Sequence, residues 1–389
     1  MAKRKQQVVE DESPVVPTFG FFKKEVEREG VRAMSAEEIG DPDPNRSGSY
    51  NLDYDLFVPF PEGRITEVFG EEGTCKTTLV LEVAGRAIQA GKIVLYVNME
   101  KNLNLSLMRT VRTLRPYIDA AIANMESGKK DADCPLWIVN ASNGEQAFEA
   151  MRKFAAMVPK GVAILDSIDA AQPEAVMAGE IGDSTVGKLA KLMSDAMRKL
   201  IGVSEQNQVA LVFVNQIRDK ITMYGDPTDT PGGYALKFYA SQRIRLFKPR
   251  KVDWILDADK ERIGSVVRYK VIKNKVAPDG NEGAFPILFR NGIFREQELV
   301  TQAANFGILR MGGKGGKQIF LPKIDRETGE YVMDGDEVAA TCMSQFNAAR
   351  RLLMDSALVD KLDAQIQELF EPGGHDPLDD LVDEVQDTE

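Results

Sequence analysis

Residues 63–78 read GRITEVFGEEGTCKTT, and this stretch decides the fold. A short apolar strand runs into a loop that ends in Lys76 and Thr77, and an amphipathic helix follows directly. In this context the pattern G-x-x-x-x-G-K-[ST] binds phosphate through backbone N–H groups and the helix N-terminus. Lys76 is expected to reach the β- and γ-phosphates, and Thr77 to ligate Mg²⁺. The predicted nucleotide-binding residues of the loop are Gly70, Glu71, Glu72, Gly73, Thr74, Cys75, Lys76, Thr77 and Thr78.

One residue of the loop departs from this pattern. Cys75 stands at the position of the second glycine. Glycine is used there because the backbone adopts a positive φ or approaches the phosphates closely, and a Cβ costs about 1–2 kcal/mol in that conformation. Three interpretations stay open: a tolerated substitution, weakened nucleotide binding, or a loop that is sensitive to thiol oxidation.

Short strands rich in Val, Ile and Leu alternate with amphipathic helices from about residue 60. Such alternation predicts an α/β fold with a mostly parallel sheet and helices on both faces. After residue 235 the strands alternate apolar and polar residues, which predicts an antiparallel extension of the sheet. The strands are expected at 63–69, 92–98, 135–141, 161–167 and 208–216, and those of the extension at 239–249, 264–274 and 284–292.

Two carboxylates follow buried strands of the predicted sheet. Asp166 closes the strand GVAILDS, which is the Walker B arrangement, and its carboxylate would hold Mg²⁺ through water. Glu100 comes just after KIVLYVN, where it could act as a general base on water. An ordinary solvated glutamate at a strand end is the alternative for Glu100.

Composition excludes several other classes of protein. With one histidine, His375, and three scattered cysteines, the chain lacks the residues of a multi-histidine metal site or a disulfide framework. No apolar run approaches the roughly 18 residues of a membrane span, and the N-terminus lacks the apolar core of a signal peptide. We therefore expect a cytoplasmic protein with no membrane partner.

The negative charge is concentrated in the last 19 residues. The net charge is −11, and eight acids lie in this tail, which has no Lys or Arg, so the first 370 residues carry only −3. A nearly neutral body can still carry a basic groove, so nucleic acid stays a candidate partner. The tail either competes with DNA for basic surfaces or only adds solubility.

Longer stretches carry a family resemblance. They are GEIGDS (179–184), DAMRKL (195–200), VFVNQIRDKI (212–221), GGYALKFYAS (232–241) and VIKNK (271–275). In this order they resemble the bacterial RecA recombinases, over about residues 47–300 and more loosely to 370. The resemblance implies a RecA-like P-loop ATPase core (47–300) after an N-terminal polymerisation arm (1–46). A small C-terminal α/β domain (301–370) and an acidic disordered tail (371–389) would follow.

The resemblance also assigns catalytic roles. Glu100 would activate the attacking water, and Gln216 would sense the γ-phosphate and pass the signal to the following loop. Lys273 and Lys275 would reach a neighbouring subunit's ATP and stabilise charge in the transition state, as an arginine finger does. Taken without the family, these two lysines are an ordinary charged strand end.

Two loops would hold single-stranded DNA, one near 179–187 and one from about 217 to 233. Glycine-rich loops bring N–H groups to phosphates, and an aromatic residue can stack with bases. Length and glycine content alone would equally fit solvated connections. The expected DNA-binding residues are Gly182, Asp183, Ser184, Val186, Gly187, Lys191, Ser194, Arg198, Arg218, Ile221, Met223, Tyr224, Gly232, Gly233 and Tyr234.

Several positions differ from the family pattern. Asn104 and Leu107 replace an aspartate and a tyrosine that hold adenine in the family, so the stacking contact is either lost or moved, and Phe289 would supply the aromatic ring in the second case. Lys191 replaces an arginine and Tyr234 an asparagine. The N-terminal arm does not match the family's long helix. Its phenylalanines either dock on a neighbouring subunit or pack on their own domain; they are Phe19, Phe21 and Phe22.

These features predict a DNA-dependent ATPase that uses ATP and Mg²⁺. It would form helical filaments on single-stranded DNA, with ATP between its own subunits, and exchange strands with homologous duplex DNA. The departures indicate a divergent member from a bacterium or a phage-infected bacterium. The alternatives are a catalytically weak, nucleotide-binding filament that coats single-stranded DNA, and a hexameric replicative helicase.

Overall fold

The computed structural model describes residues 18–29, 33, 35, 40–127, 134–179, 187–219, 228–257, 259–312, 318–325, 328, 331–332, 338–342 and 344–370. The chain forms two compact units, Met1–Pro42 and Asp43–Glu389. The first contains helix α1 (Phe19–Arg28), which lies in the arm whose sequence does not match the family's long helix. Phe19 and Phe22 on α1 are 42% and 54% exposed, and the side chain of Phe21 lies outside the described residues. Their docking role stays a prediction.

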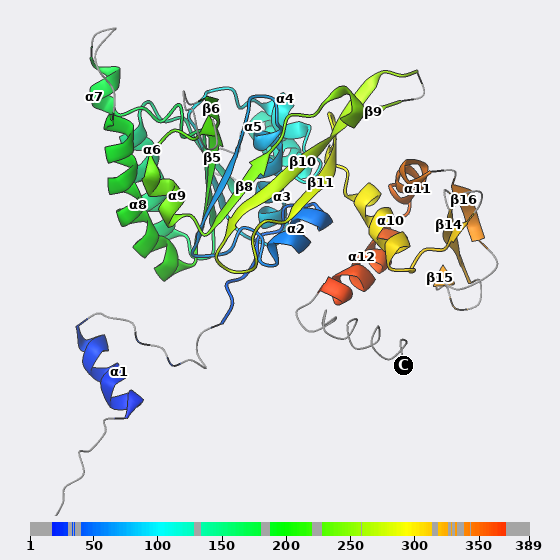
Figure 1. Ribbon diagram of the computed structural model, residues 1–389, viewed down its shortest axis with the longest axis horizontal. Helices are drawn as coiled ribbons and strands as arrows, with labels where there is room; N and C mark the ends of the chain where they lie inside the picture. Colours follow the sequence, from blue (N-terminus) through cyan, green and yellow to red (C-terminus); the bar gives the residue numbers. More distant parts are fainter. Residues whose placement is uncertain are drawn as a thin grey trace, which may run out of the picture. The chain divides into compact units, whose positions relative to one another are not determined.

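Ten of the described strands form one sheet in the second unit (Figure 1). Six of them run parallel in the order β8-β1-β5-β4-β2-β3. Their apolar residues alternate between the two faces, as shown by Leu211 and Phe213 on one side and Val212 and Val214 on the other. The parallel strands are β1 (Ile65–Gly70), β2 (Val94–Asn98), β3 (Leu136–Val139), β4 (Val162–Asp166), β5 (Ala210–Gln216) and β8 (Gln242–Leu246).

The antiparallel extension begins one strand later than the sequence predicts. Strand β8, expected to belong to the extension, pairs parallel with β1. Strands β9 (Trp254–Leu256), β10 (Arg262–Asn274), β11 (Glu282–Leu288) and β12 (Gly292–Ile293) are antiparallel. The prediction for β8 was wrong because its alternating pattern reports exposure on one face, which an outer parallel strand also has.

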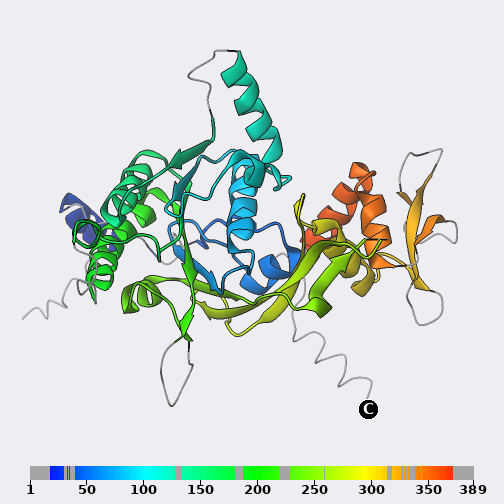
Figure 2. The same ribbon diagram turned by 90° about the horizontal axis from the view of Figure 1, so that it is seen from above.

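Helices cover both faces of the sheet, and each face has its own apolar core. Two groups of helices, one for each face, can be told apart in Figures 1 and 2. One group is α2 (Tyr50–Leu56), α3 (Lys76–Gln89), α4 (Leu105–Arg109) and α5 (Arg115–Glu126), and the other is α6 (Gly144–Met157), α8 (Lys188–Asn207) and α9 (Tyr234–Tyr239). Two short elements stand outside these groups, helix α7 (Glu174–Met177) and the strand pair β6 (Arg218–Asp219) and β7 (Thr228–Asp229). The doubly covered parallel sheet confirms the predicted fold class.

A smaller α/β body follows the sheet and has a third apolar core. It consists of α10 (Arg295–Asn305), β13 (Met311–Gly312), β14 (Gln318–Ile324), β15 (Tyr331–Val332), β16 (Val338–Cys342), α11 (Gln345–Leu352) and α12 (Ser356–Phe370). Tyr50 of α2 is part of this core, which ties the smaller body to the sheet domain. The acidic tail, residues 371–389, lies outside the described residues. Among the described helices, none combines the length and apolar character that a membrane span needs.

Candidate active site at the carboxyl edge of the sheet

The loop between β1 and α3 has the geometry that its glycines predict. Gly70 lies against β8, and a Cβ there would come within 2.4 Å of the Leu246 carbonyl oxygen. Gly73 has φ +76°, which L side chains rarely adopt. The two glycines are therefore required for different reasons, one for close packing and one for backbone conformation.

Cys75 occupies the left-handed region at φ 64° and ψ 26°, immediately before α3. The departure seen in the sequence is thus a non-glycine residue in a glycine conformation, at a cost of about 1–2 kcal/mol. The thiol packs against the apolar core beneath α3, and burial raises the pKa of Cys75. Because the thiolate is the reactive form, a raised pKa disfavours the oxidation-sensitive interpretation and leaves the other two, a tolerated substitution and weakened nucleotide binding.

Lys76 lies inside the loop, with its side chain largely buried. Its Nζ donates to the carbonyl oxygens of Gly70 (2.9 Å) and Glu71 (2.7 Å). Burial lowers the pKa of Lys76, while the charges of Asp166 and Glu100 oppose that shift. The ammonium group therefore lies within the loop at the start of α3, which is the position that a phosphate-binding lysine needs.

Asp166 lies at the end of β4, next to the first turn of α3. Its Oδ2 accepts hydrogen bonds from Thr77 Oγ1 (2.8 Å) and Tyr96 Oη (2.6 Å), and burial raises the pKa of the carboxyl group. The hydroxyl and carboxylate oxygens that converge here are the ligand type that Mg²⁺ prefers, directly or through water. Thr77 and Asp166 therefore fit the predicted metal role.

Tyr96 was missed by the sequence analysis. It is fully buried in the middle of β2, and its hydroxyl reaches Asp166 on the neighbouring strand. A usable indication was present, because a tyrosine inside a buried apolar strand needs a hydrogen-bond partner for its O–H. Which partner it finds depends on the β2–β4 register.

Glu100 follows β2 and meets side chains from two neighbouring strands. Its Oε1 accepts hydrogen bonds from Ser167 Oγ (2.6 Å) and Gln216 Nε2 (3.3 Å), and its Oε2 accepts one from Asn102 (2.9 Å). The carboxylate is therefore held in place by three hydrogen-bond donors, as a general base that must be aimed at a water molecule requires. Ser167, the residue after Asp166, was also missed by the sequence analysis.

A buried polar group lies directly behind Gln216. Asn215 donates from Nδ2 to Glu67 Oε1 (2.9 Å) and to the carbonyl oxygen of Pro231 (3.0 Å). Glu67, fully buried in β1, forms an ion pair with Arg243 of β8 at 2.5 Å. The residue before Gly232 is thus hydrogen-bonded to the same strand end that carries Gln216.

Lys273 and Lys275 contact the C-terminal end of α9. Lys273 Nζ donates to the carbonyl oxygens of Lys237 (2.7 Å) and Phe238 (3.0 Å), and Lys275 Nζ to that of Phe238 (3.3 Å). Ammonium groups are favourable at the negative end of a helix dipole. Burial, followed by the charge of Lys275, lowers the pKa of Lys273.

The two positions expected to hold adenine are engaged within the chain. Asn104 caps α4: its Oδ1 accepts from the Leu107 backbone N–H (2.9 Å), and its Nδ2 donates to the Asn102 carbonyl oxygen (3.3 Å). Phe289 is 45% exposed, and the Arg262 guanidinium carbon lies 5.0 Å from its ring centre. Their roles towards a base stay predictions.

The expected DNA-binding residues that the structure describes gather around α8 and α9. Gly187 precedes α8 at φ +79°, and a Cβ on Gly233 would come within 2.9 Å of the Ala190 side chain on that helix. Tyr234 is 82% exposed at the start of α9. Lys191 and Ser194 lie on α8, Arg198 is paired with Asp195 and Arg218 with Asp169, and Gly232 has φ +94°. Gly182, Asp183, Ser184, Val186, Ile221, Met223 and Tyr224 lie outside the described residues.

The site and its sheet are those of an α/β ATPase of the P-loop class. A family profile described as the RecA N-terminal domain matches residues 19–294. Protein RecA of Porphyromonas gingivalis is 33% identical over 319 residues, covering 80% of this chain and 87% of the relative. Protein RecA of Chlorobium limicola is 39% identical over 287 residues (73% and 74%), and Protein RecA 2 of Myxococcus xanthus is 39% identical over 299 residues (75% and 77%). The chain belongs to the RecA family.

The match extends further towards the N-terminus than the sequence analysis placed it. It begins at residue 19 and so includes α1, whereas the quoted motifs supported a resemblance only from about residue 47. Among solved structures, the crystal structure of the RadB recombinase has a TM-score of 0.45 at 18% identity, and the match covers 64% of this chain and 98% of that one.

Proposed function

We propose that this protein is an ATP-dependent recombinase that assembles on single-stranded DNA and pairs it with homologous duplex DNA. One observation carries the proposal: in a RecA-family chain, Lys76, Asp166, Glu100 and Gln216 converge at the carboxyl edge of one parallel sheet. Open α/β sheets bind their ligands at this edge.

Each residue of this group has a chemical task. Backbone N–H groups of the loop and the Lys76 ammonium neutralise the phosphates, and Thr77 and Asp166 would hold Mg²⁺. The metal supplies charge neutralisation on the phosphate oxygens when it is bound. Glu100, held by Ser167, takes the proton from the attacking water.

The same residues provide a route from nucleotide to DNA. Gln216 contacts Glu100, and its neighbour Asn215 contacts Pro231, directly before Gly232 and Gly233. A shift of the end of β5 on binding a γ-phosphate would therefore move the base of the second predicted DNA loop. This supports a mechanism in which ATP stabilises the DNA-binding state and hydrolysis releases it.

Lys273 and Lys275 supply the link between subunits in this proposal. Both ammonium groups end at an exposed surface beside Phe238, which is 71% exposed. In a filament they would face the neighbouring subunit's ATP and stabilise charge in the transition state. ATP bound between subunits would then couple assembly to hydrolysis.

A filament that coats DNA without useful turnover is the second candidate. Cys75 in a left-handed conformation and Asn104 engaged as a helix cap favour it. Both features weaken nucleotide binding without removing the groups that perform hydrolysis.

ATP hydrolysis measured with and without single-stranded DNA separates the two candidates, with Glu100→Gln as the control. The glutamine amide has the same shape as the carboxylate and can still contact Ser167 and Gln216, but it cannot accept a proton from water. Strong stimulation by DNA that the control loses supports the recombinase. Nucleotide-dependent DNA binding without turnover in the unaltered protein supports the coat instead.

A further inference from the structure

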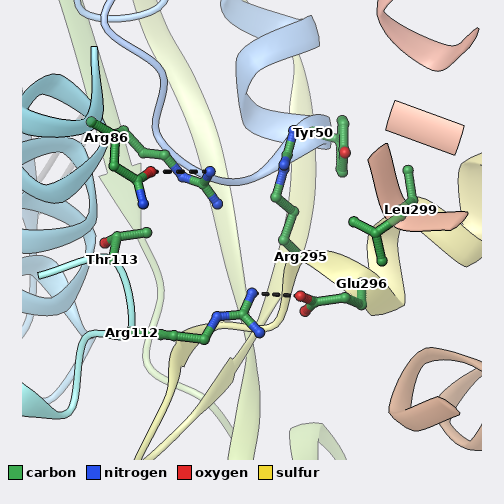
Figure 3. Close-up of a pocket in the computed structure, with 9 residues that line it drawn as sticks. Tyr50, Arg86, Arg112, Thr113, Arg295, Glu296 and Leu299 are labelled. Carbon is green, nitrogen blue, oxygen red and sulfur yellow. Dashed lines mark hydrogen bonds and ion pairs between the residues drawn. The ribbon is translucent and has the colours of Figure 1, made fainter. Parts of the chain in front are cut away.

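A cavity of about 150 Å³ lies at the far end of α3 from the phosphate loop (Figure 3). Arg86 of α3, Arg112 from the segment before α5, and Arg295 of α10 all line it. Arg86 lies ten residues after Lys76, which is about 15 Å along a helix. The cavity is therefore separate from the nucleotide site and lies where the sheet domain meets the smaller α/β body.

Two of the three arginines have partners. Arg112 forms an ion pair with Glu296 at 2.5 Å. Arg295 forms one with Asp363 at 2.6 Å and stacks on the Tyr50 ring, 4.3 Å from its centre. Tyr50 and Glu296 also line the cavity. The Arg112–Glu296 pair joins the sheet domain to α10, whereas the Arg295–Asp363 pair joins α10 to α12, and the stacking on Tyr50 links Arg295 to α2.

Arg86 is different. Within the part of the chain that the structure describes, it forms no ion pair, and its guanidinium makes one long hydrogen bond, 3.5 Å to Gln89. Its Nε is buried and has no hydrogen-bond partner there. An arginine normally satisfies its five donors when it is buried, so this group lacks an acceptor.

The surrounding charges do not supply that acceptor. Burial, followed by the positive charge of Arg295 and to a smaller extent that of Arg112, lowers the pKa of Arg86, and Glu82 and Asp53 oppose this shift. The Glu82 carboxylate is already engaged by Thr113 Oγ1 and the Ile293 backbone N–H, both at 2.9 Å. Burial also raises the pKa of Glu82, and no ion pair between Glu82 and Arg86 forms within the described residues.

We propose that this cavity binds a small oxyanion of the phosphate class, held chiefly by Arg86 and Arg295, with Arg112 at the rim. The lining carries three guanidinium groups and one carboxylate, and that carboxylate, Glu296, is already paired. A cavity of this volume holds a molecule as large as benzene, so a tetrahedral phosphate group fits. Arg112 is 38% exposed, which leaves a way in from solvent.

The bound oxyanion would fasten the phosphate-loop helix to the smaller α/β body. Arg86 belongs to α3 and Arg295 to α10, so one anion between them bridges the two bodies. Free phosphate and a terminal phosphomonoester share the required chemistry. The inference does not depend on the proposed recombinase activity.

Equilibrium dialysis of the full chain with radiolabelled inorganic phosphate tests the proposal. The variants are Arg86→Gln, Lys76→Ala to remove phosphate binding at the nucleotide loop, and both together. Arg109→Gln is the matched control, since Arg109 is an exposed arginine paired with Asp119. We expect Arg86→Gln to lower the phosphate affinity of one class of sites at least tenfold, both alone and in the Lys76→Ala background. Arg109→Gln should leave that affinity unchanged. Phosphate binding in Arg86→Gln equal to that of the unaltered chain overturns the proposal.

Thermal unfolding distinguishes a binding role of Arg86 from a structural one. Without phosphate, Arg86→Gln should unfold at the same or a higher temperature, because it removes a partly buried cation that has no ion-pair partner among the described residues. When phosphate is added at constant ionic strength, the unfolding temperature of Arg86→Gln should rise less than that of the unaltered chain. If Arg86→Gln lowers the unfolding temperature by the same amount with and without phosphate, Arg86 only supports the fold. Repeating the experiment with adenosine monophosphate distinguishes the two ligands that share this chemistry. In the Lys76→Ala background, a rise in unfolding temperature equal to that with phosphate indicates that the cavity takes a phosphomonoester. No rise indicates that it takes the free ion.

Discussion

Replacing Cys75 by glycine should stabilise the protein relative to replacing it by alanine. The backbone at this position has φ 64° and ψ 26°, which costs a residue with a Cβ about 1–2 kcal/mol. Glycine avoids that cost but loses about 0.5–1 kcal/mol more backbone freedom on folding. The difference leaves about 0.5–1 kcal/mol in favour of glycine. Alanine is the matched comparison because both variants lack the sulfur and its core contacts.

This difference can be measured by thermal unfolding of the two variants under identical conditions. A change of 1 kcal/mol shifts the midpoint of a domain of 150–250 residues by about 2–4 °C, so Cys75→Gly should unfold roughly 1–4 °C above Cys75→Ala. Compared with the unaltered chain, both variants also lose the core contacts of the thiol. Their unfolding midpoints should therefore lie below the values that relief of strain alone would give. An alanine variant as stable as the glycine variant, or more stable, would refute the strained left-handed conformation on which the argument rests.

Three further outcomes follow from the site and its surroundings. Tyr96→Phe should raise the Mg²⁺ concentration for half-maximal hydrolysis several-fold, because Asp166 loses the donor that orients it; an unchanged Mg²⁺ titration would contradict this role. Lys273→Ala combined with Lys275→Ala should abolish DNA-stimulated hydrolysis. The free energy of unfolding should fall by only about 0.3–1 kcal/mol for each lost contact to the end of α9. Normal turnover in the folded variant would exclude the subunit-bridging role. Burial raises the pKa of Glu298 to about 8, so its stabilising contribution is present at low pH and is lost as pH rises from about 5 to 8; Glu298→Gln should flatten this fall in urea unfolding, and an unchanged slope would show that other groups cause it.

The sequence predicts the part of the site that depends on local pattern. Lys76 and Thr77 are recognised because a strand end, a loop and a helix start are consecutive in the chain, and Asp166 because it closes an apolar strand. Tyr96 and Ser167 complete the site through the pairing of strands that are far apart in the sequence, and the β2–β4 register cannot be derived from either strand alone. The position of β8 was wrong for a related reason, since exposure on one face does not reveal strand direction.

The cavity around Arg86 was invisible to sequence reasoning for a further physical cause. An arginine at the end of an amphipathic helix normally extends its charge into water. The packing of α10 against the sheet domain brings Arg295 near it, and its Nε is buried in the folded chain. Charge that three separate segments assemble is a property of the tertiary fold, and no single stretch of sequence contains it.

The end of β5 links the two activities through the geometry of a strand. Successive side chains point to opposite faces, so Gln216 shares the face of Val212 and Val214, towards α3, while Asn215 shares the face of Leu211 and Phe213, towards α8 and α9. Gln216 can thus contact Glu100 while Asn215 holds Pro231. A displacement of this strand end changes both sites together, because a strand cannot move one face without the other. The coupling of ATP to DNA in the proposed mechanism therefore needs no long chain of contacts, only two adjacent residues on one strand.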